Sequence, residues 1–309
     1  MKLFRSLSAI VATLGVFLAL PTVAHAASTP SPSCVVSLSP SATETLFAIG
    51  AGSQVKAVDQ DANFPTTGLP NLRVDAFNPS TEALASICPT SKAHPSATPD
   101  LVVISYDANS IKEGLTALGV KVVEQDAPNT LADALGEIRA LGQLTGHVAA
   151  ANALASKIQG QIATDVKSIS TMKKAHPLKN LSVYYELDPT YYSLTSDTFV
   201  GSLLKSLGVT NVADAAASPT DYGYPQLTAE YLIGASPKLI LLADTKCCAI
   251  NATVVKGRAG WSTMASVRSG HLVGLDDDVA SRWGPRLSLL MNQLTAAVKA
   301  TELDPKAWK

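Results

Sequence analysis

The stretch from residue 276 to residue 286 gathers side chains that could hold a polar ligand. It begins with three consecutive aspartates and continues through Arg282 and Trp283. It follows a predicted strand over 271–275 and precedes a predicted helix over 286–298, which is where open α/β sheets bind their ligands. A tryptophan ring stacks on a flat ligand, and arginine and aspartate hydrogen-bond to its polar edges. The simpler alternative is that the aspartates cap the helix and the arginines pair with neighbouring acids.

Motifs of the common enzyme classes are absent from the sequence. Gly50 and Gly52 lack the third glycine of a dinucleotide-binding loop and follow a predicted helix, so they indicate a helix end. There is no phosphate-binding loop, no nucleophile elbow and no zinc-protease histidine pair. The histidines beyond residue 26 are far apart in the sequence: His94, His147, His176 and His271. We therefore expect no catalytic residue, no resident metal and no cofactor. A secreted enzyme that holds a metal on the three aspartates is the less favoured alternative.

The chain has four cysteines: Cys34, Cys88, Cys247 and Cys248. They are too few for a small disulfide-rich scaffold. However, the first 26 residues have the pattern of a signal peptide, and an exported protein can form disulfides. We predict one bridge between Cys34 and Cys88 and another between the neighbours Cys247 and Cys248, although a bridge between neighbours closes a strained ring. The alternative for the neighbours is a thiolate metal site, for which the sequence offers no further ligands at a recognisable spacing.

Short apolar runs alternate with helical periodicity along the chain. Runs such as 101–104 and 239–242 predict buried strands, and 41–49 predicts a helix. Ser41 and Glu44 have the spacing of a capping box, so we expect Ser41 to cap that helix. The alternation predicts an α/β fold with parallel strands covered by helices.

A helical pattern of roughly 25 residues, from 148 to 172, would span about 37 Å. It is either a long helix packed on one domain or a rigid strut between two domains.

Two segments in different halves of the chain resemble each other. Residues 79–104 and 226–242 each contain a short capped helix, a proline turn and a buried strand. If the similarity is an internal repeat rather than shared local architecture, Glu82 and Glu230 occupy equivalent positions.

The first 26 residues have the pattern of a signal peptide. Lys2 and Arg5 precede an apolar run over 7–20 that is too short for a membrane helix, and Ala24-His25-Ala26 is a typical cleavage pattern. We expect an exported, periplasmic or extracellular protein that is soluble after cleavage. A lipid anchor on Cys34 is not expected, because the preceding residues lack the leucine of a lipobox.

The composition is that of a globular protein with a large core. The 309 residues are 47% hydrophobic and 16% charged, with a formal net charge of -1. The length suggests two domains. The charge balance lacks the basic excess of a nucleic-acid-binding protein, so we expect no nucleic-acid partner.

Five segments, in this order, resemble the cobalamin- and ferric-siderophore-binding proteins of bacterial ABC importers, most closely the cobalamin branch. They are residues 36–44, 78–82, 99–102, 224–230 and 281–286. The resemblance covers about residues 34–300.

The resemblance implies two Rossmann-like α/β lobes with parallel sheets, joined by one long helix, with the ligand in the cleft between them and little lobe closure. The implied domains are a signal peptide (1–26), an N-terminal lobe (27–145), a linker helix (146–176) and a C-terminal lobe (177–309).

The family's pocket positions imply ten ligand-binding residues in this chain. They are Ser39, Pro40, Ser41, Asp61, Phe77, Leu187, Tyr224, Asp278, Arg282 and Trp283. Positions that flank the corrin in a well-known cobalamin binder are changed here to Asp61, Phe77 and Tyr224, which leaves the ligand open.

The resemblance implies a monomeric binding protein that delivers cobalamin or a related corrinoid to a dimeric permease. A ferric siderophore or haem is the alternative cargo. The family docks one glutamate of each lobe onto permease arginines, and the matching residues are Glu82 and Glu230. Two exposed carboxylates can form bidentate pairs with arginine and fix the register of docking. The alternative is that both are solvated glutamates favoured near a helix N-terminus.

Overall fold

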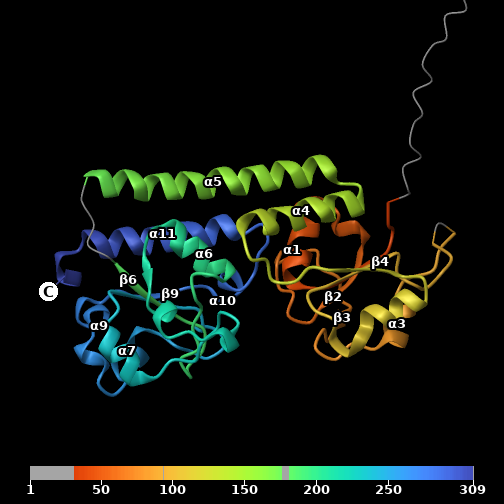
Figure 1. The fold of residues 1–309 in the computed structure, drawn as a ribbon. Coiled ribbons are helices and arrows are strands. Elements are labelled where there is room, and N and C mark those ends of the chain that lie inside the picture. Colours follow the sequence, from red (N-terminus) through yellow and green to blue (C-terminus); the bar gives the residue numbers. More distant parts are fainter. Residues whose placement is uncertain (1–30, 93, 176–180, 309) are drawn as a thin grey trace, which may run out of the picture. The chain divides into compact units, whose positions relative to one another are not determined.

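The computed structural model describes residues 31–92, 94–175 and 181–308, which form two parallel β-sheets with helices on their faces (Figure 1). The strand orders are β3-β2-β1-β4-β5 and β7-β6-β8-β9. The strands are β1 (Val35–Leu38), β2 (Val55–Asp59), β3 (Arg73–Val74), β4 (Leu101–Ile104), β5 (Lys121–Glu124), β6 (Ser182–Glu186), β7 (Thr210–Asn211), β8 (Leu239–Leu242) and β9 (Leu272–Gly274). The predicted fold class, two parallel-sheet α/β lobes, is confirmed.

Eleven α-helices are present in the described residues. They are α1 (Pro40–Ala48), α2 (Thr81–Ala85), α3 (Ile111–Ala117), α4 (Leu131–Thr145), α5 (Val148–Ala175), α6 (Phe199–Ser206), α7 (Ala229–Ala235), α8 (Ala252–Lys256), α9 (Ala265–Ser269), α10 (Asp277–Ala280) and α11 (Leu287–Leu303). Short 3-10 turns complete several connections. In the described part of the chain, no helix is long and apolar enough to cross a membrane.

The central strands are apolar because helices cover both faces of each sheet. Strands β1, β4 and β8 are buried at every residue. Near-continuous apolar runs of this kind are typical of parallel sheets, whereas half-exposed antiparallel strands alternate. This burial is why runs of valine, leucine and isoleucine predicted the strands.

Helix α5 has 28 residues and lies within the predicted linker range of 146–176. Gly146, at φ 80°, ends α4 in the left-handed conformation that glycine adopts without strain. Both α4 and α11 pack along α5 (Figure 1). One apolar cluster contains residues of both sheets and of α5, such as Val35, Ile158 and Leu239. Helix α5 is therefore part of the core of both halves. The last linker residue, His176, lies outside the described residues.

Four strands of the first sheet, in the order β2-β1-β4-β5, repeat the order β7-β6-β8-β9 of the second. In each, the strand after a short helix (α2 before β4, α7 before β8) pairs with the first strand of its half. Ser80 accepts a hydrogen bond from Ala83 N at 3.3 Å to cap α2, and Thr228 accepts one from Tyr231 N at 3.1 Å to cap α7. The repeat suggested by the sequence is thus present in the fold.

Helix α1 begins before the predicted position. Its N-cap is Ser39, whose Oγ accepts a hydrogen bond from Ala42 N at 3.3 Å, and Pro40 is the first helical residue. Proline suits that position because its φ is helical and an N–H there has no partner in the helix. The prediction of Ser41 as the cap with Glu44 completing a capping box is therefore wrong, and the Glu44 side chain serves another purpose.

Of the two predicted disulfides, one is formed. Cys34 and Cys88 are bonded, with 6.1 Å between their Cα atoms. Cys247 and Cys248 are free and exposed, so the predicted bridge between them is wrong. Their loop is held differently: Cys247 N donates to Asp277 Oδ2 at 2.9 Å, and a bridge between neighbours would strain this backbone. The signal-peptide prediction for residues 1–26 lies outside the described residues.

Candidate functional site

Two pockets meet at the segment Ser281–Trp283. The polar pocket, about 270 Å³, is lined by Ser39, Pro40, Ser41, Asp61, Ser105, Asp278, Ser281, Arg282 and Trp283. The apolar pocket, about 260 Å³, is lined by Ala127, Leu187, Leu194, Phe199, Val200, Tyr224, Ala243, Ala280, Ser281, Arg282, Trp283 and Leu290. Because they share three residues, we treat them as two parts of one candidate site, with Ser281–Trp283 as the shared wall.

Strand register explains why these residues meet. Leu38 pairs with Ile104 at the ends of β1 and β4, so Ser39 and Ser105 leave the first sheet side by side. In the second sheet the last residues of β6 and β8 are paired in the same way, and the next residues, Leu187 and Ala243, line the apolar pocket. The site thus lies at the carboxyl edges of both sheets, where open α/β folds bind ligands.

The shared wall is placed by close contact with α1. Trp283 N donates to Ser41 Oγ at 3.3 Å. A Cβ on Gly284 would lie 3.1 Å from the Ser41 carbonyl oxygen, which is tighter than most such contacts. Glycine at this position therefore lets the chain approach the start of α1.

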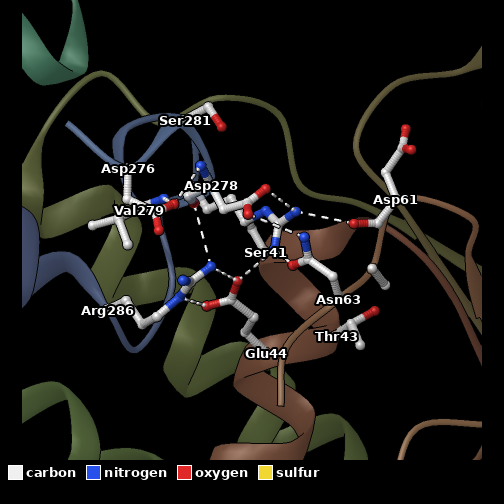
Figure 2. Close-up of polar contacts among 12 residues, drawn as sticks. Ser41, Thr43, Glu44, Asp61, Asn63, Asp276, Asp278, Val279, Ser281 and Arg286 are labelled. Atoms are coloured by element: carbon white, nitrogen blue, oxygen red, sulfur yellow. Dashed lines mark hydrogen bonds and ion pairs between the residues drawn. The ribbon is translucent and has the colours of Figure 1, made fainter. Parts of the chain in front are cut away.

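Behind the shared wall, Glu44 bonds two arginines (Figure 2). Its Oε1 accepts from Arg282 Nη1 at 2.9 Å and from Arg286 Nη2 at 2.5 Å, and its Oε2 accepts from Arg286 Nε at 2.9 Å. Glu44 is 1% exposed. Charge-assisted bonds in a buried place are strong, and removing one partner leaves the others unpaired. This cluster therefore ties the 282–286 segment to α1.

Asp278 links the shared wall to Lys246 and Asn63. It accepts from Arg282 Nη2 at 2.9 Å, from Lys246 Nζ at 2.7 Å and from Asn63 Nδ2 at 3.0 Å. Burial alone would raise the pKa of Asp278, but the hydrogen bonds from Lys246 and Asn63 and the charge of Arg282 hold it below its ordinary value. Asp278 is thus a carboxylate at neutral pH, and most of its bonding capacity is used.

Trp283 is held from the other side by α4. Its side chain hydrogen-bonds to the Glu137 carboxyl group. Burial raises the pKa of Glu137 to about 7, even though the bond from Trp283 favours the charged form. Two carboxyl groups of the first half, on α1 and α4, therefore position a wall that belongs to the second half of the sequence.

The structure brings together nine of the ten predicted ligand-binding residues. Seven line the polar pocket, and Leu187 and Tyr224 line the apolar pocket. Phe77 lines neither; it is 67% exposed and packs on Tyr106 with 5.8 Å between ring centroids. The Asp61 carboxylate points away from the Glu44 cluster (Figure 2). Ligand contact by these residues remains a prediction.

Local sequence patterns do not reveal the residues that support the wall. Glu44 fits a helix-capping pattern, and Asn63, Lys246, Ser105 and Glu137 belong to no recognised motif. Ser105 could have been found, because it directly follows a buried parallel strand. Glu44 and Glu137 carried no such signal, since an acidic residue in a helix is usually on its exposed face.

The two candidate docking glutamates occupy matching places. Glu82 and Glu230 are exposed in the first turns of α2 and α7. Hydrogen bonds from the backbone and from Ser80 lower the pKa of Glu82, so it is a carboxylate at neutral pH. Residues 31–92, 94–175 and 181–308 contain no group of three or more His, Cys, Asp or Glu arranged to hold a metal ion.

Comparisons with curated proteins find relatives along most of the chain. It is 26% identical to the uncharacterized ABC transporter substrate-binding lipoprotein YvrC of Bacillus subtilis, over 86% of this chain and 80% of the relative. It is 25% identical to the cobalamin-binding protein of Halobacterium salinarum, over 88% and 71%. It is also 25% identical to the vitamin B12-binding protein of Pectobacterium atrosepticum, over 90% and 92%.

Solved structures share the fold. A possible iron-binding periplasmic solute-binding protein of Staphylococcus epidermidis has a TM-score of 0.71 at 24% identity, covering 87% of this chain and 99% of that one. The periplasmic vitamin B12 binding protein of Vibrio cholerae has 0.70 at 18% identity, covering 89% and 99%. The periplasmic heme-binding protein of Roseiflexus sp. RS-1 has 0.71 at 22% identity, covering 87% and 99%.

A family profile also matches this chain. The family profile described as periplasmic binding protein matches residues 35–279, which is most of the chain. The chain therefore belongs to the periplasmic binding protein family, whose members are solute-binding proteins.

Proposed function

We propose that this protein binds cobalamin or a related corrinoid at the shared wall and delivers it to the permease of an ABC importer. The observation that carries the proposal is the composition of the site: an apolar pocket and a hydroxyl-lined polar pocket meet at Trp283. A flat, largely apolar ring edged with neutral amides matches such a pair of surfaces. Relatives that align with most of the chain are named for cobalamin binding.

The polar pocket offers hydrogen bonds and no unpaired positive charge. Four serines line it, and its arginine, Arg282, is bonded to Glu44 and Asp278. Hydroxyl groups both donate and accept, as amide groups do, so the two kinds of group can pair. Each pocket is slightly smaller than the 300 to 1,000 Å³ that is typical of ligand sites, so a corrinoid would occupy both and extend beyond them.

Haem is the second candidate, because solved structures of heme-binding proteins share the fold. A ferric iron would need an anionic or imidazole ligand. No histidine lines either pocket. Of the tyrosines, Tyr224 lines the apolar pocket. Burial raises the pKa of Tyr224, which disfavours the phenolate that iron would bind. Haem also carries two carboxylates, for which the pockets present no free cation. Both features favour the corrinoid.

Export and docking complete the proposal. We infer that the protein works outside the cytoplasm as a monomer and that Glu82 and Glu230 dock onto permease arginines. A lipid on Cys34 would require a free thiol, and that thiol is bonded to Cys88. One relative is named a lipoprotein, so the absence of any lipid anchor remains an expectation.

Calorimetric titration of the purified protein tests the cargo. We expect cyanocobalamin to bind with a Kd in the micromolar range or below, and haem and a ferric tris-catecholate chelate to bind at least tenfold more weakly. Trp283→Ala serves as the site variant and should weaken cyanocobalamin binding by about tenfold or more. Tighter binding of haem than of cyanocobalamin would replace the corrinoid with the second candidate.

A further inference from the structure

We propose that Glu44 determines cargo specificity: its bonds to Arg282 and Arg286, together with the bond of Asp278 to Arg282, leave the site without a free cation, so that the site rejects anionic cargo. The inference rests on the proposed function, because it concerns the same site and names which chemical forms of a ligand that site accepts. Glu44 need not touch the cargo, since it acts through the two arginines.

The four Nη donors of Arg282 all have partners. A guanidinium has four Nη protons and one Nε proton. Nη1 donates to Glu44 Oε1 at 2.9 Å and to Asn63 Oδ1 at 2.7 Å. Nη2 donates to the Asp61 carbonyl at 3.0 Å and to Asp278 Oδ1 at 2.9 Å. With four acceptors around its two Nη atoms and 8% exposure, Arg282 cannot offer a two-bond contact to a cargo carboxylate.

The neighbouring cations Arg286 and Lys246 are also paired with carboxylates. Arg286 gives its Nε and one Nη2 bond to Glu44, and its guanidinium lies 4.6 Å from the Phe64 ring centroid. Lys246 Nζ lies 2.7 Å from both Asp276 and Asp278. Each cation of this cluster is therefore paired with at least one carboxylate.

The local charge is negative when these groups are taken together. Three cations, Arg282, Arg286 and Lys246, face four carboxylates, Glu44, Asp61, Asp276 and Asp278. An excess of one negative charge in a partly buried site repels a carboxylate and leaves a neutral amide unaffected. The site therefore favours a cargo whose polar edges are amides over one whose polar edges are acids.

Two corrinoids that differ by one charge test this directly. Cyanocobalamin is compared with the monocarboxylic acid formed by hydrolysing one of its peripheral propionamides. For the natural protein we expect the acid to bind about tenfold more weakly at low salt. The gap should shrink at high salt, because screening weakens the repulsion. This measurement needs no variant.

Glu44→Gln and Asp61→Asn form a matched pair of variants. Each removes one negative charge, but only Glu44→Gln also releases guanidinium donors. We expect Glu44→Gln to abolish or reverse the difference in affinity between the monocarboxylic acid and cyanocobalamin. Asp61→Asn should reduce that difference only in part. Far-ultraviolet circular dichroism and thermal unfolding check that each variant is folded.

Equal affinity of the natural protein for the two corrinoids would overturn the inference while leaving the proposed cargo intact. The inference would also be overturned if Glu44→Gln and Asp61→Asn reduced the difference in affinity between the acid and cyanocobalamin equally. The loss of one negative charge would then explain the whole effect, with no role for the released arginine donors. If neither corrinoid binds, the proposed cargo is wrong, and a ferric tris-catecholate trianion becomes the probe. Tight binding of that trianion by the natural protein would contradict anion rejection, and binding gained only in Glu44→Gln would support it.

Discussion

Buried carboxyl groups do different work at different places in this protein. Glu44 and Glu137 position the shared wall, whereas Glu186 and Asp244 lie at the carboxyl edge of the second sheet. Glu186 accepts from Arg258 at 2.5 and 2.6 Å in a two-bond pair. Asp244 is buried beside it, and burial, followed by the charge of Glu186, raises the pKa of Asp244 to about 7. Arg258 bonds Glu186, whereas it affects Asp244 only through its charge, which lowers the pKa of Asp244 less than burial and Glu186 raise it.

We expect Asp244→Asn to stabilise the protein at pH 8 more than at pH 5. The raised folded-state pKa means that this group's stabilisation is complete below the ordinary pKa of 3.8 and is lost as pH rises through about 7. The amide of the variant does not ionise in this pH range, so the variant does not lose stability as the pH rises. Thermal unfolding should show a Tm gain of roughly 3–6 °C at pH 8 and a smaller one at pH 5.

Asp197→Asn is the control for that experiment, because Asp197 is exposed and lies 3.9 Å from Lys205. Its Tm should follow that of the natural protein at both pH values. A Tm gain for Asp244→Asn that is the same at pH 5 and pH 8 would show that the carboxyl group does not titrate in this range.

At the scale of elements, the carboxyl ends of strands supply the site, and a disulfide fixes the opposite end of β1. The bond between Cys34 and Cys88 joins the start of β1 to the segment after α2 and closes a loop with a sequence separation of 54. A cross-link of that length removes conformational entropy from the unfolded chain, worth about 4 kcal/mol in the loop-closure account. It also ties α2, which carries Glu82, to the sheet.

Replacing both cysteines, Cys34→Ala with Cys88→Ala, should lower the Tm by roughly 5–10 °C. Reducing agent should lower the Tm of the natural protein by a similar amount and leave the double variant unchanged. The pair Cys247→Ala with Cys248→Ala is the control, since both thiols are free and exposed. If reducing agent left the Tm of the natural protein unchanged, the bond between Cys34 and Cys88 would not contribute to stability.

At the scale of the whole molecule, the repeat places one exposed glutamate at the same position of each half. Glu82 follows the cap Ser80 by two residues, and Glu230 follows the cap Thr228 by two. A partner that is itself a symmetric dimer could contact both in the same way. The duplicated topology, rather than either helix alone, supports the docking proposal.

Glu82→Arg with Glu230→Arg should abolish cargo uptake into cells that carry the cognate importer while cargo affinity stays within about twofold. Cargo affinity should be preserved because both residues are exposed and line neither pocket. Uptake should be lost because arginine at these positions would repel the permease arginines. Glu113→Arg, an exposed glutamate in the first turn of α3, is the matched control and should transport normally. Uptake that persists in the double variant, or a large loss of cargo affinity, would count against docking by these residues.

The sequence predicted most elements because their signals are local. Apolar runs such as 101–104 and 239–242 became central strands, and the long periodic stretch became α5. The failures concern details that neighbours decide. Ser41 fits a capping box, but Pro40 starts the helix one residue earlier. Cys247 and Cys248 are adjacent, but Asp277 holds their loop.

The candidate site was only partly accessible from the sequence. Nine of ten residues implied by the family resemblance do line the pockets, and all of them except Tyr224 follow a strand or belong to the 276–286 stretch. Phe77 is apart from them because its ring packs on Tyr106 outside both pockets. The supporting groups were missed because nothing near them in the sequence reveals their partners.

Local pattern by itself predicted the parallel α/β class and the long helix and suggested the repeat, since strand burial and helical periodicity are properties of neighbouring residues. Only the tertiary structure decided that Glu44 bonds Arg282 and Arg286, which lie 238 and 242 positions further along the chain. A bond of that kind depends on how the first and last parts of the chain pack together, and so it determines which charges the site presents.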